Sequence, residues 1–150
     1  MTLSVLLQIA VVALAVAAAT GLAWLDARRD SVESARQRAL GVAETFAHSP
    51  DVLAALHARN PAAVLQPMAE SVRGATGVDF VVVMRPDGVR YSHPNPSLIG
   101  GHFLGNTGPA LAGRPFTETF TGTLGPSVRA VVPVPGDGRP VQGLVAVGIT

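Results

Sequence analysis

An uninterrupted apolar segment near the N-terminus is the feature that most constrains this chain. It extends from Leu3 to Leu25, and Trp24 lies where an interfacial aromatic residue is expected. Its polar side chains are Ser4, Gln8 and Thr20. A helix of about 23 residues, at 1.5 Å per residue, exceeds the roughly 30 Å hydrocarbon thickness of a bilayer. The segment therefore predicts a transmembrane helix over residues 1–25.

A cleaved signal peptide is the alternative interpretation of this segment. The small residues Ala17, Ala18 and Ala19 are compatible with a cleavage site. However, no basic residue precedes the apolar stretch, and the stretch is longer than the usual apolar region of a signal peptide. These two features favour a retained membrane anchor.

The charges beside the span favour an orientation that conflicts with our overall interpretation. Arg28 and Arg29 follow the apolar segment, and the positive-inside rule would place the rest of the chain in the cytoplasm. Asp26 and Asp30 flank this pair but count little in the rule. The orientation therefore stays open on charge alone.

The composition excludes several classes of function. All 11 basic residues are arginine, so a Schiff-base lysine and a P-loop lysine are both excluded. The chain has no cysteine, which excludes disulfides and thiolate metal sites. The net charge is +1 and the arginines are scattered, so we expect no nucleic-acid partner. The residues after the span suffice for one domain of ordinary size.

Helical patterns continue beyond the apolar segment. Apolar residues recur every three or four positions without an intervening proline, which predicts a long helix over residues 26–48 that continues from the span. Ser49-Pro50 and Asn60-Pro61 each place an N-cap residue before a proline at the first helical position. They predict a second helix and a third that reaches about Ala75, with a kink or break at Pro67.

Short β-branched and aromatic runs follow the helices and predict a sheet. Residues 85–88 (RPDG) form a type I turn between the first two runs, and residues 135–138 (PGDG) form a turn between the last two. A crossing rich in proline and glycine, with a short helix at 107–111, lies between them. The expected strands are 79–84, 89–92, 116–122, 127–134 and 141–149. The fold class is α+β, with N-terminal helices and a five-stranded antiparallel sheet.

Two loop-forming stretches concentrate side chains that can bind an anion. Residues 90–96 (RYSHPNP) must leave the sheet because of their prolines, and residues 121–129 (TGTLGPSVR) contain two glycines that let backbone amides approach a ligand. The candidate ligand-binding residues are Arg90, His93, Thr123, Ser127 and Arg129. The set contains donors and no carboxylate, so it suits a carboxylate ligand, which a guanidinium binds bidentately.

The spacing of Arg90 and His93 sets a geometric condition. Residues three apart on a regular strand point to opposite faces, so the strand must end or bulge at Ser92 if both contact one ligand. A cationic His93 would titrate near pH 6.5. The affinity for a fully ionised ligand should then improve as the pH falls from 8 to 6.

Other functions have weaker support in the sequence. Each candidate residue alone has an ordinary explanation, such as a solvated arginine or a loop histidine bonded to backbone. Glu118 and His93 could be drawn as a base and its orienting partner, but no nucleophile or paired carboxylate supports an enzyme. The four histidines are dispersed, and we expect no catalytic residue, metal or cofactor. The alternative function is a membrane-tethered interaction domain without a small-molecule ligand.

The two loop-forming stretches carry the motifs of a known family. Arg-x-x-His-x-Asn-Pro at 90–96 and Gly-Thr-Leu-Gly-x-Ser-x-Arg at 122–129 resemble, in order and spacing, the extracytoplasmic sensor domain of the citrate and C4-dicarboxylate sensor histidine kinases. The resemblance covers almost the whole chain. It implies a PAS-like (PDC-type) domain over residues 49–150 that binds a di- or tricarboxylate and signals across the bacterial cell membrane.

The resemblance also implies roles for individual residues. It identifies the family's first pair of carboxylate ligands with Arg90 and His93, its second arginine with Arg129 and its hydroxyl ligand with Thr123. Citrate-binding members carry a lysine or hydroxyls at three positions that are apolar here, namely Val82, Val131 and Ala146. These departures favour a smaller dicarboxylate over citrate.

The family further implies partners beyond the ligand. We expect a homodimer anchored in the membrane by one span, with the globular domain outside the cytoplasm. The chain stops at Thr150, where members of the family enter a second membrane helix and continue to a kinase. We therefore expect this chain to sense without phosphorylating, and to reach a cytoplasmic response regulator only through that kinase part.

Overall fold

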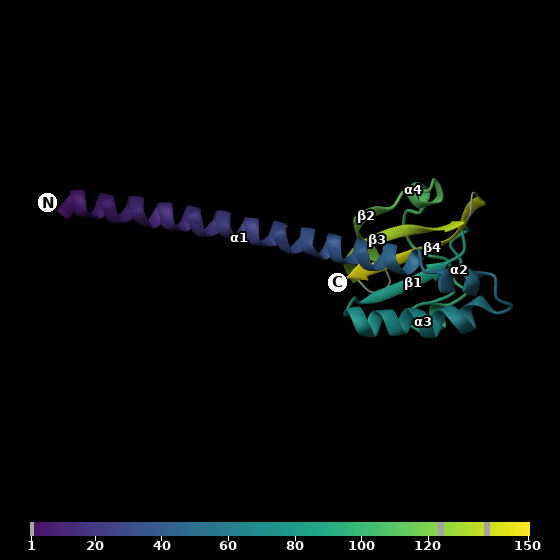
Figure 1. The fold of residues 1–150 in the computed structure, drawn as a ribbon. Helices are drawn as coiled ribbons and strands as arrows, with labels where there is room; N and C mark the ends of the chain where they lie inside the picture. Colours follow the sequence, from purple (N-terminus) through teal and green to yellow (C-terminus); the bar gives the residue numbers. More distant parts are fainter. Residues whose placement is uncertain (1, 123–124, 137–138) are drawn as a thin grey trace. The chain divides into compact units, whose positions relative to one another are not determined.

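The protein has an α+β fold, as predicted from the sequence. The structure, a computed structural model, describes residues 2–122, 125–136 and 139–150. Helices precede most of the strands in chain order, and one antiparallel sheet contains every strand of this described part (Figure 1). The chain divides into two compact units, residues 1–34 and Ala35–Thr150.

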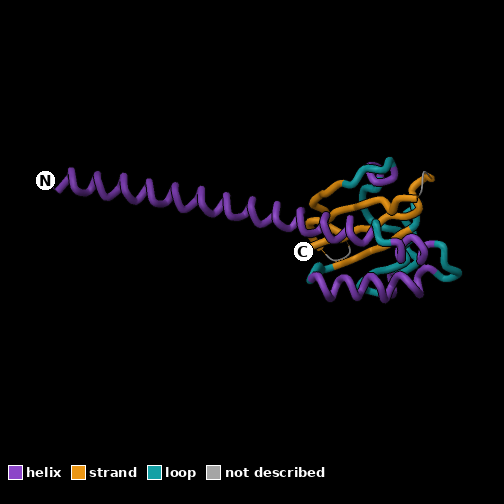
Figure 2. Tube along the Cα trace, in the orientation of Figure 1, coloured by secondary structure: helices purple, strands orange, loops and turns teal. Residues whose placement is uncertain are grey.

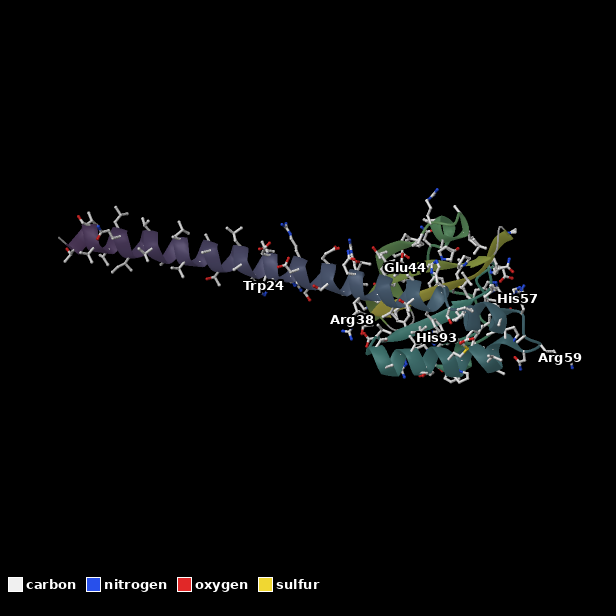
Figure 3. The ribbon with its side chains drawn as sticks, in the orientation of Figure 1. Trp24, Arg38, Glu44, His57, Arg59 and His93 are labelled. Atoms are coloured by element: carbon white, nitrogen blue, oxygen red, sulfur yellow. The ribbon has the colours of Figure 1, made fainter. Side chains whose placement is uncertain are left out.

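Helix α1 (Thr2–Ala47) is one uninterrupted helix. This continuity confirms the prediction that the apolar segment and the following helix are joined. Its apolar part includes an 18-residue window with a mean hydropathy of 2.4, so by length and composition α1 can cross a membrane. Trp24, labelled in Figure 3, contacts the Arg28 guanidinium at 4.6 Å from the ring centroid.

Helices α2 (Pro50–Leu56) and α3 (Pro61–Thr76) begin at the two predicted prolines. Of the predicted kink or break at Pro67, the break is wrong, because α3 continues through this residue, and the kink stays a prediction. Proline deprives the carbonyl of the fourth preceding residue, Ala63, of its helical partner. Both Pro67 and Ala63 are exposed, so a water molecule can donate to the Ala63 carbonyl. The helix therefore tolerates the missing N–H at Pro67.

The sheet has the strand order β1-β4-β3-β2, and all its pairs are antiparallel. The strands are β1 (Phe80–Met84), β2 (Phe116–Gly122), β3 (Gly125–Gly136) and β4 (Arg139–Ile149). The predicted turn at 135–138 falls partly outside the described residues. Between β1 and β2 the chain forms a short 3-10 helix (Pro96–Leu98) and α4 (Gly108–Leu111), and Figure 2 draws most of this segment as loop.

The predicted fifth strand at 89–92 is wrong. Only isolated bridges, Met84 with Arg90 and Val89 with His102, are found there in the described structure. The reason is Ser92, whose hydroxyl accepts the Val83 N–H at 2.7 Å and donates to the Val81 carbonyl at 3.2 Å. A side chain thus takes the backbone partners that a fifth strand would need, and the chain leaves the edge of β1.

The two faces of the sheet have different coverings. The helix face packs against α1, α2 and α3 and carries alternate strand residues such as Val81, Val132 and Val145. The opposite face, which we call the loop face, carries the other set, including Phe80, Val82, Val131 and Ala146, and packs against α4 and its neighbouring loops. This alternation follows from the two-residue period of a strand. The polar side chains predicted to bind a ligand must therefore share the loop face with an apolar cluster.

The Ser92 hydroxyl is expected to stabilise the fold measurably. Ser92→Ala leaves the Val83 N–H and the Val81 carbonyl without this partner in a fully buried position. The free energy of unfolding should fall by about 1–3 kcal/mol. Urea denaturation of the chain in mild detergent measures the change, with exposed Ser71→Ala on α3 as the control. Equal stability of the two variants would contradict this role for Ser92.

Candidate functional site

Four of the five predicted ligand-binding residues line one cavity on the loop face. Arg90 and His93 come from the segment that leaves β1, and Ser127 and Arg129 come from β3. Thr123, the fifth, lies outside the described residues. The cavity has a volume of about 30 Å³. Among the residues that the structure describes, its lining is Phe80, Val82, Arg90, His93, Phe103, Leu104, Gly122, Gly125, Ser127 and Arg129.

Arg90 is held by the loop that crosses over the cavity. Its backbone N–H donates to the Gly101 carbonyl at 3.0 Å, and its Nη1 donates to the Leu98 carbonyl at 3.1 Å. The residue is only 5% exposed, and burial lowers the pKa of its guanidinium. Arginine remains a cation at neutral pH even so. Among the described residues, no carboxylate lies within ion-pair distance of this buried charge.

The strand exit at Ser92 brings His93 to the same cavity as Arg90. The geometric condition set by their spacing is met because Ser92 turns inward while the chain departs from β1. Gln66 of α3 then fixes His93 by its main chain: Gln66 Oε1 accepts the His93 N–H and Gln66 Nε2 donates to the His93 carbonyl, both at 2.9 Å. Figure 3 shows His93 beside α3. Gln66 thus positions the imidazole.

The His93 imidazole is neutral in this geometry. Its Nδ1 accepts the Asn95 backbone N–H at 2.9 Å, which places the ring proton on Nε2. Burial, and then the positive charge of Arg90, lower the pKa of His93 from its usual 6.5, while the charge of Glu70 opposes this shift. The expectation that His93 titrates near pH 6.5 in the free state is therefore wrong for this structure, in which its pKa is lower. At neutral pH His93 presents the cavity with a neutral donor.

Arg129 is surrounded by protein acceptors and aromatic rings. Its Nε and Nη2 donate to one oxygen of Glu118, at 2.9 and 2.5 Å, and its Nη1 donates to the Leu104 carbonyl at 2.8 Å. The guanidinium carbon lies 3.7 Å from the ring centroid of Phe120 and 4.7 Å from that of Phe103. Arg129 is only 3% exposed. These contacts fix both the position and the plane of the guanidinium.

Gly105 allows the crossing loop to approach Arg129. A Cβ atom at this position would lie 1.6 Å from Nη2 of Arg129, and the φ angle of Gly105 is +128°. Both the space and the backbone conformation therefore require glycine here. The carbonyl of Leu104, one residue earlier, can reach Arg129 only because of this close approach.

Glu118 corrects our prediction that the donor set contains no carboxylate. Glu118 and Arg129 are directly paired across β2 and β3, so their side chains share the loop face. The sequence had suggested Glu118 as a partner of His93, but the structure pairs it with Arg129. Counting outward from the paired residues Gly122 and Gly125 would have found this pair. Gln66 is 27 residues from His93 in the sequence, and no sequence pattern predicted their contact.

The remaining polar group of the cavity is the Ser127 hydroxyl. It donates to the Phe120 carbonyl at 3.2 Å, so its oxygen keeps acceptor capacity toward the cavity. In the ranges that the structure describes, no three histidine or carboxylate side chains are grouped to hold a metal ion. The site therefore combines two buried guanidiniums and a neutral imidazole donor above an apolar floor, while the Ser127 proton is already donated to Phe120. This chemistry suits a small anion that also has apolar surface.

The sequence is similar to a known domain family and to known sensor proteins. Residues 26–150 match the single Cache domain 3 family (sCache_3_2). Over 118 residues, 77% of the chain, the sequence is 40% identical to sensor protein CitS of Halalkalibacterium halodurans. Over 125 residues, 83% of the chain, it is 32% identical to sensor histidine kinase DcuS of Escherichia coli. The chain spans 22% of the length of each of these relatives.

The fold of the chain is also similar to a solved sensor domain. The crystal structure of the E. coli DcuS sensor domain superposes with a TM-score of 0.73 at 31% identity. The match covers 79% of this chain and 90% of that domain.

The lowered pKa of His93 should make stability depend on pH. Below pH 6.5 the unfolded chain binds a proton that the folded His93 does not, so the free energy of unfolding should fall as the pH drops from about 6.5 toward the folded pKa. Above pH 6.5 both states are neutral and this contribution is fully present. Denaturation at pH 7.5, 6.5 and 5.5 measures how steeply the free energy of unfolding depends on pH. His93→Gln should reduce this slope more than His102→Gln, the control at an exposed histidine. Equal slopes in wild type and His93→Gln would contradict the lowered pKa.

Proposed function

The chain belongs to the single Cache domain 3 family, and on this premise we propose that it is the extracytoplasmic sensing module of a two-component sensor histidine kinase. In this function the cavity on the loop face binds a small di- or tricarboxylate. Binding closes the crossing loop onto the sheet, and the change is transmitted across the membrane. The membrane anchor is α1, whose composition and length suit a span.

The observation that carries this proposal is the buried charge of Arg90. Arg90 is 5% exposed and has no carboxylate within ion-pair distance among the described residues. Such a buried cation is unfavourable unless an anion compensates it. Its neighbours in the cavity, His93 and Arg129, are also donors. A ligand carboxylate would supply both the negative charge and the acceptor oxygens. A partner-binding domain without a small ligand would not need these buried donors, so the cavity supports the sensing function over that alternative.

The available contacts are sufficient for useful affinity. Four or five charge-assisted hydrogen bonds contribute about 1.5–3 kcal/mol each. Their sum, about 6–15 kcal/mol, spans the roughly 8 kcal/mol of a micromolar complex, and its upper part leaves a margin for desolvation and ordering.

The floor of the cavity supports a small dicarboxylate over citrate. Val82, Ala146 and Val131 are paired in one row across β1, β4 and β3, so the three apolar departures from citrate-binding members adjoin one another. All three are buried in the apolar cluster of the loop face. Val82 lines the cavity and the other two residues lie beside it in the row, so this part of the sheet offers no side-chain donor to a third carboxylate. Val82 can instead pack against the carbon skeleton of a C4 acid.

Signalling would require parts beyond this chain's sensor domain. The relatives are a sensor protein and a sensor histidine kinase, and this chain spans 22% of their length. The proposal therefore assigns ligand binding to this chain and phosphotransfer to a response regulator to a kinase part. A homodimer is the expected assembly.

Removing Arg129 should abolish carboxylate binding. Calorimetry of the full chain in detergent, titrated with fumarate, malate, succinate, tartrate and citrate, should show binding of at least one dicarboxylate. Arg129→Ala should weaken it about a hundredfold or more, because at least one bidentate charge-assisted contact is lost. Arg114→Ala, which removes an exposed arginine near β2, should bind as wild type does. No heat with any acid, or unchanged binding by folded Arg129→Ala, would overturn the proposal.

The orientation across the membrane can be decided directly. We expect the residues after α1 to lie outside the cytoplasm, against the charge bias of Arg28 and Arg29. Alkaline phosphatase fused after Thr150 should be active in intact bacteria, and a green fluorescent protein fused there through the same export route should be dark. The reverse pattern would place the domain in the cytoplasm.

A further inference from the structure

Glu118 is a carboxylate of the protein itself that contacts the candidate ligand-binding arginine. We propose that Glu118 competes with the ligand for Arg129: a ligand carboxylate displaces the Glu118 carboxylate from the guanidinium, and this exchange selects dicarboxylates over monocarboxylates. The inference rests on the proposed function, because it assigns a second role to residues of the same cavity.

The geometry shows that Glu118 holds one complete edge of Arg129. A single oxygen of Glu118 accepts from both Nε and Nη2, at 2.9 and 2.5 Å. The third nitrogen, Nη1, donates to the Leu104 carbonyl. A ligand carboxylate therefore cannot form the side-on bidentate contact with Arg129 while Glu118 remains there.

The size of the cavity also requires a rearrangement. At about 30 Å³ it has room for one or two water molecules, far less than a C4 dicarboxylate. Some group that now fills the space around Arg129 must move when a ligand enters.

Among the groups that hold Arg129, Glu118 is the one best able to move. The backbone at Gly105 packs directly against the guanidinium, and Phe120 belongs to the strand β2 and stacks on it. The side chain of Glu118 is 24% exposed, whereas that of Arg129 is 3% exposed. Glu118 lies on the edge strand β2, so its carboxylate can turn toward water while the sheet stays intact. Water solvates the released carboxylate, which lowers the cost of the exchange.

The exchange leaves no buried charge unpaired. One carboxylate replaces another on Arg129, so this guanidinium remains neutralised before and after binding. A monocarboxylate bound at Arg129 would gain little, because its single group only substitutes for Glu118, and one bound at Arg90 would make no contact of this kind with Arg129. A dicarboxylate would gain the exchange and also compensate Arg90, which has no carboxylate neighbour among the described residues. Displacing Glu118 from Arg129 therefore costs free energy, and only a ligand with a second carboxylate regains it at Arg90.

The test compares a dicarboxylate with a monocarboxylate of the same carbon number. The full chain in detergent, as wild type and as Glu118→Gln, is titrated calorimetrically with the five acids above and with butyrate, which pairs with succinate. Glu118→Gln removes the competing charge and preserves the shape of the side chain. It should tighten dicarboxylate binding about tenfold or more and make butyrate binding measurable. Asp87→Asn, which removes a surface ion pair with Arg85 away from the cavity, should change neither affinity.

The outcomes separate this inference from the proposed function. If wild type binds a dicarboxylate and Glu118→Gln binds it equally or more weakly, Glu118 is not a competitor, while the sensing function stands. If neither protein binds any acid, both proposals fail.

A second variant covers the case in which Glu118→Gln does not fold. Glu118→Asp keeps the charge but shortens the reach to Arg129, so it should shift both affinities in the same direction by a smaller factor. Circular dichroism of each variant checks the fold. Unchanged or weakened dicarboxylate binding by a folded Glu118→Asp would overturn the inference.

Discussion

The buried guanidinium of Arg129 is the interaction on which the rest of the cavity depends. A cation at 3% exposure must have its charge and its donors compensated within the protein, because an unpaired buried charge destabilises the fold by several kcal/mol. The structure meets this requirement from three directions: Glu118 across the strand pair, the Leu104 carbonyl from the crossing loop, and the rings of Phe120 and Phe103. Because the loop supplies one of these partners, the position of the loop and the neutralisation of Arg129 are linked.

The other half of the cavity depends on how the chain leaves β1. Ser92 terminates the edge of the sheet by taking backbone partners with its hydroxyl, and this frees the next residue to point into the cavity. Gln66 then holds the His93 main chain by two hydrogen bonds. Helix α3 packs on the opposite face, so Gln66 connects the helix layer to the ligand side around the edge of β1. A displacement of His93 would thus pull directly on Gln66 and on α3.

Local signals predicted the elements, and tertiary contacts decided the details that the sequence could not reveal. Prolines at the first helical position placed the starts of α2 and α3, and alternation placed four strands, because these features depend on neighbours in sequence. The segment 89–92 read as a strand because its backbone propensity is local, whereas the competing Ser92 contacts are to residues of β1. Arg90 and Arg129 were recognisable from their motifs, but Gln66 had no motif and entered the site through a distant contact. Glu118 could have been found only by fixing the register of the β2–β3 hairpin.

The central place of β4 limits how this domain can change shape. β4 forms ladders with β1 on one side and β3 on the other, and its alternate residues fill two different apolar clusters. Sliding β4 by one residue would exchange its buried faces and break both ladders at once. We therefore expect β1, β4 and β3 to move together as one rigid unit. A displacement of Arg129 on β3 would therefore tilt the three strands together relative to the helices. It would not slide one strand past another.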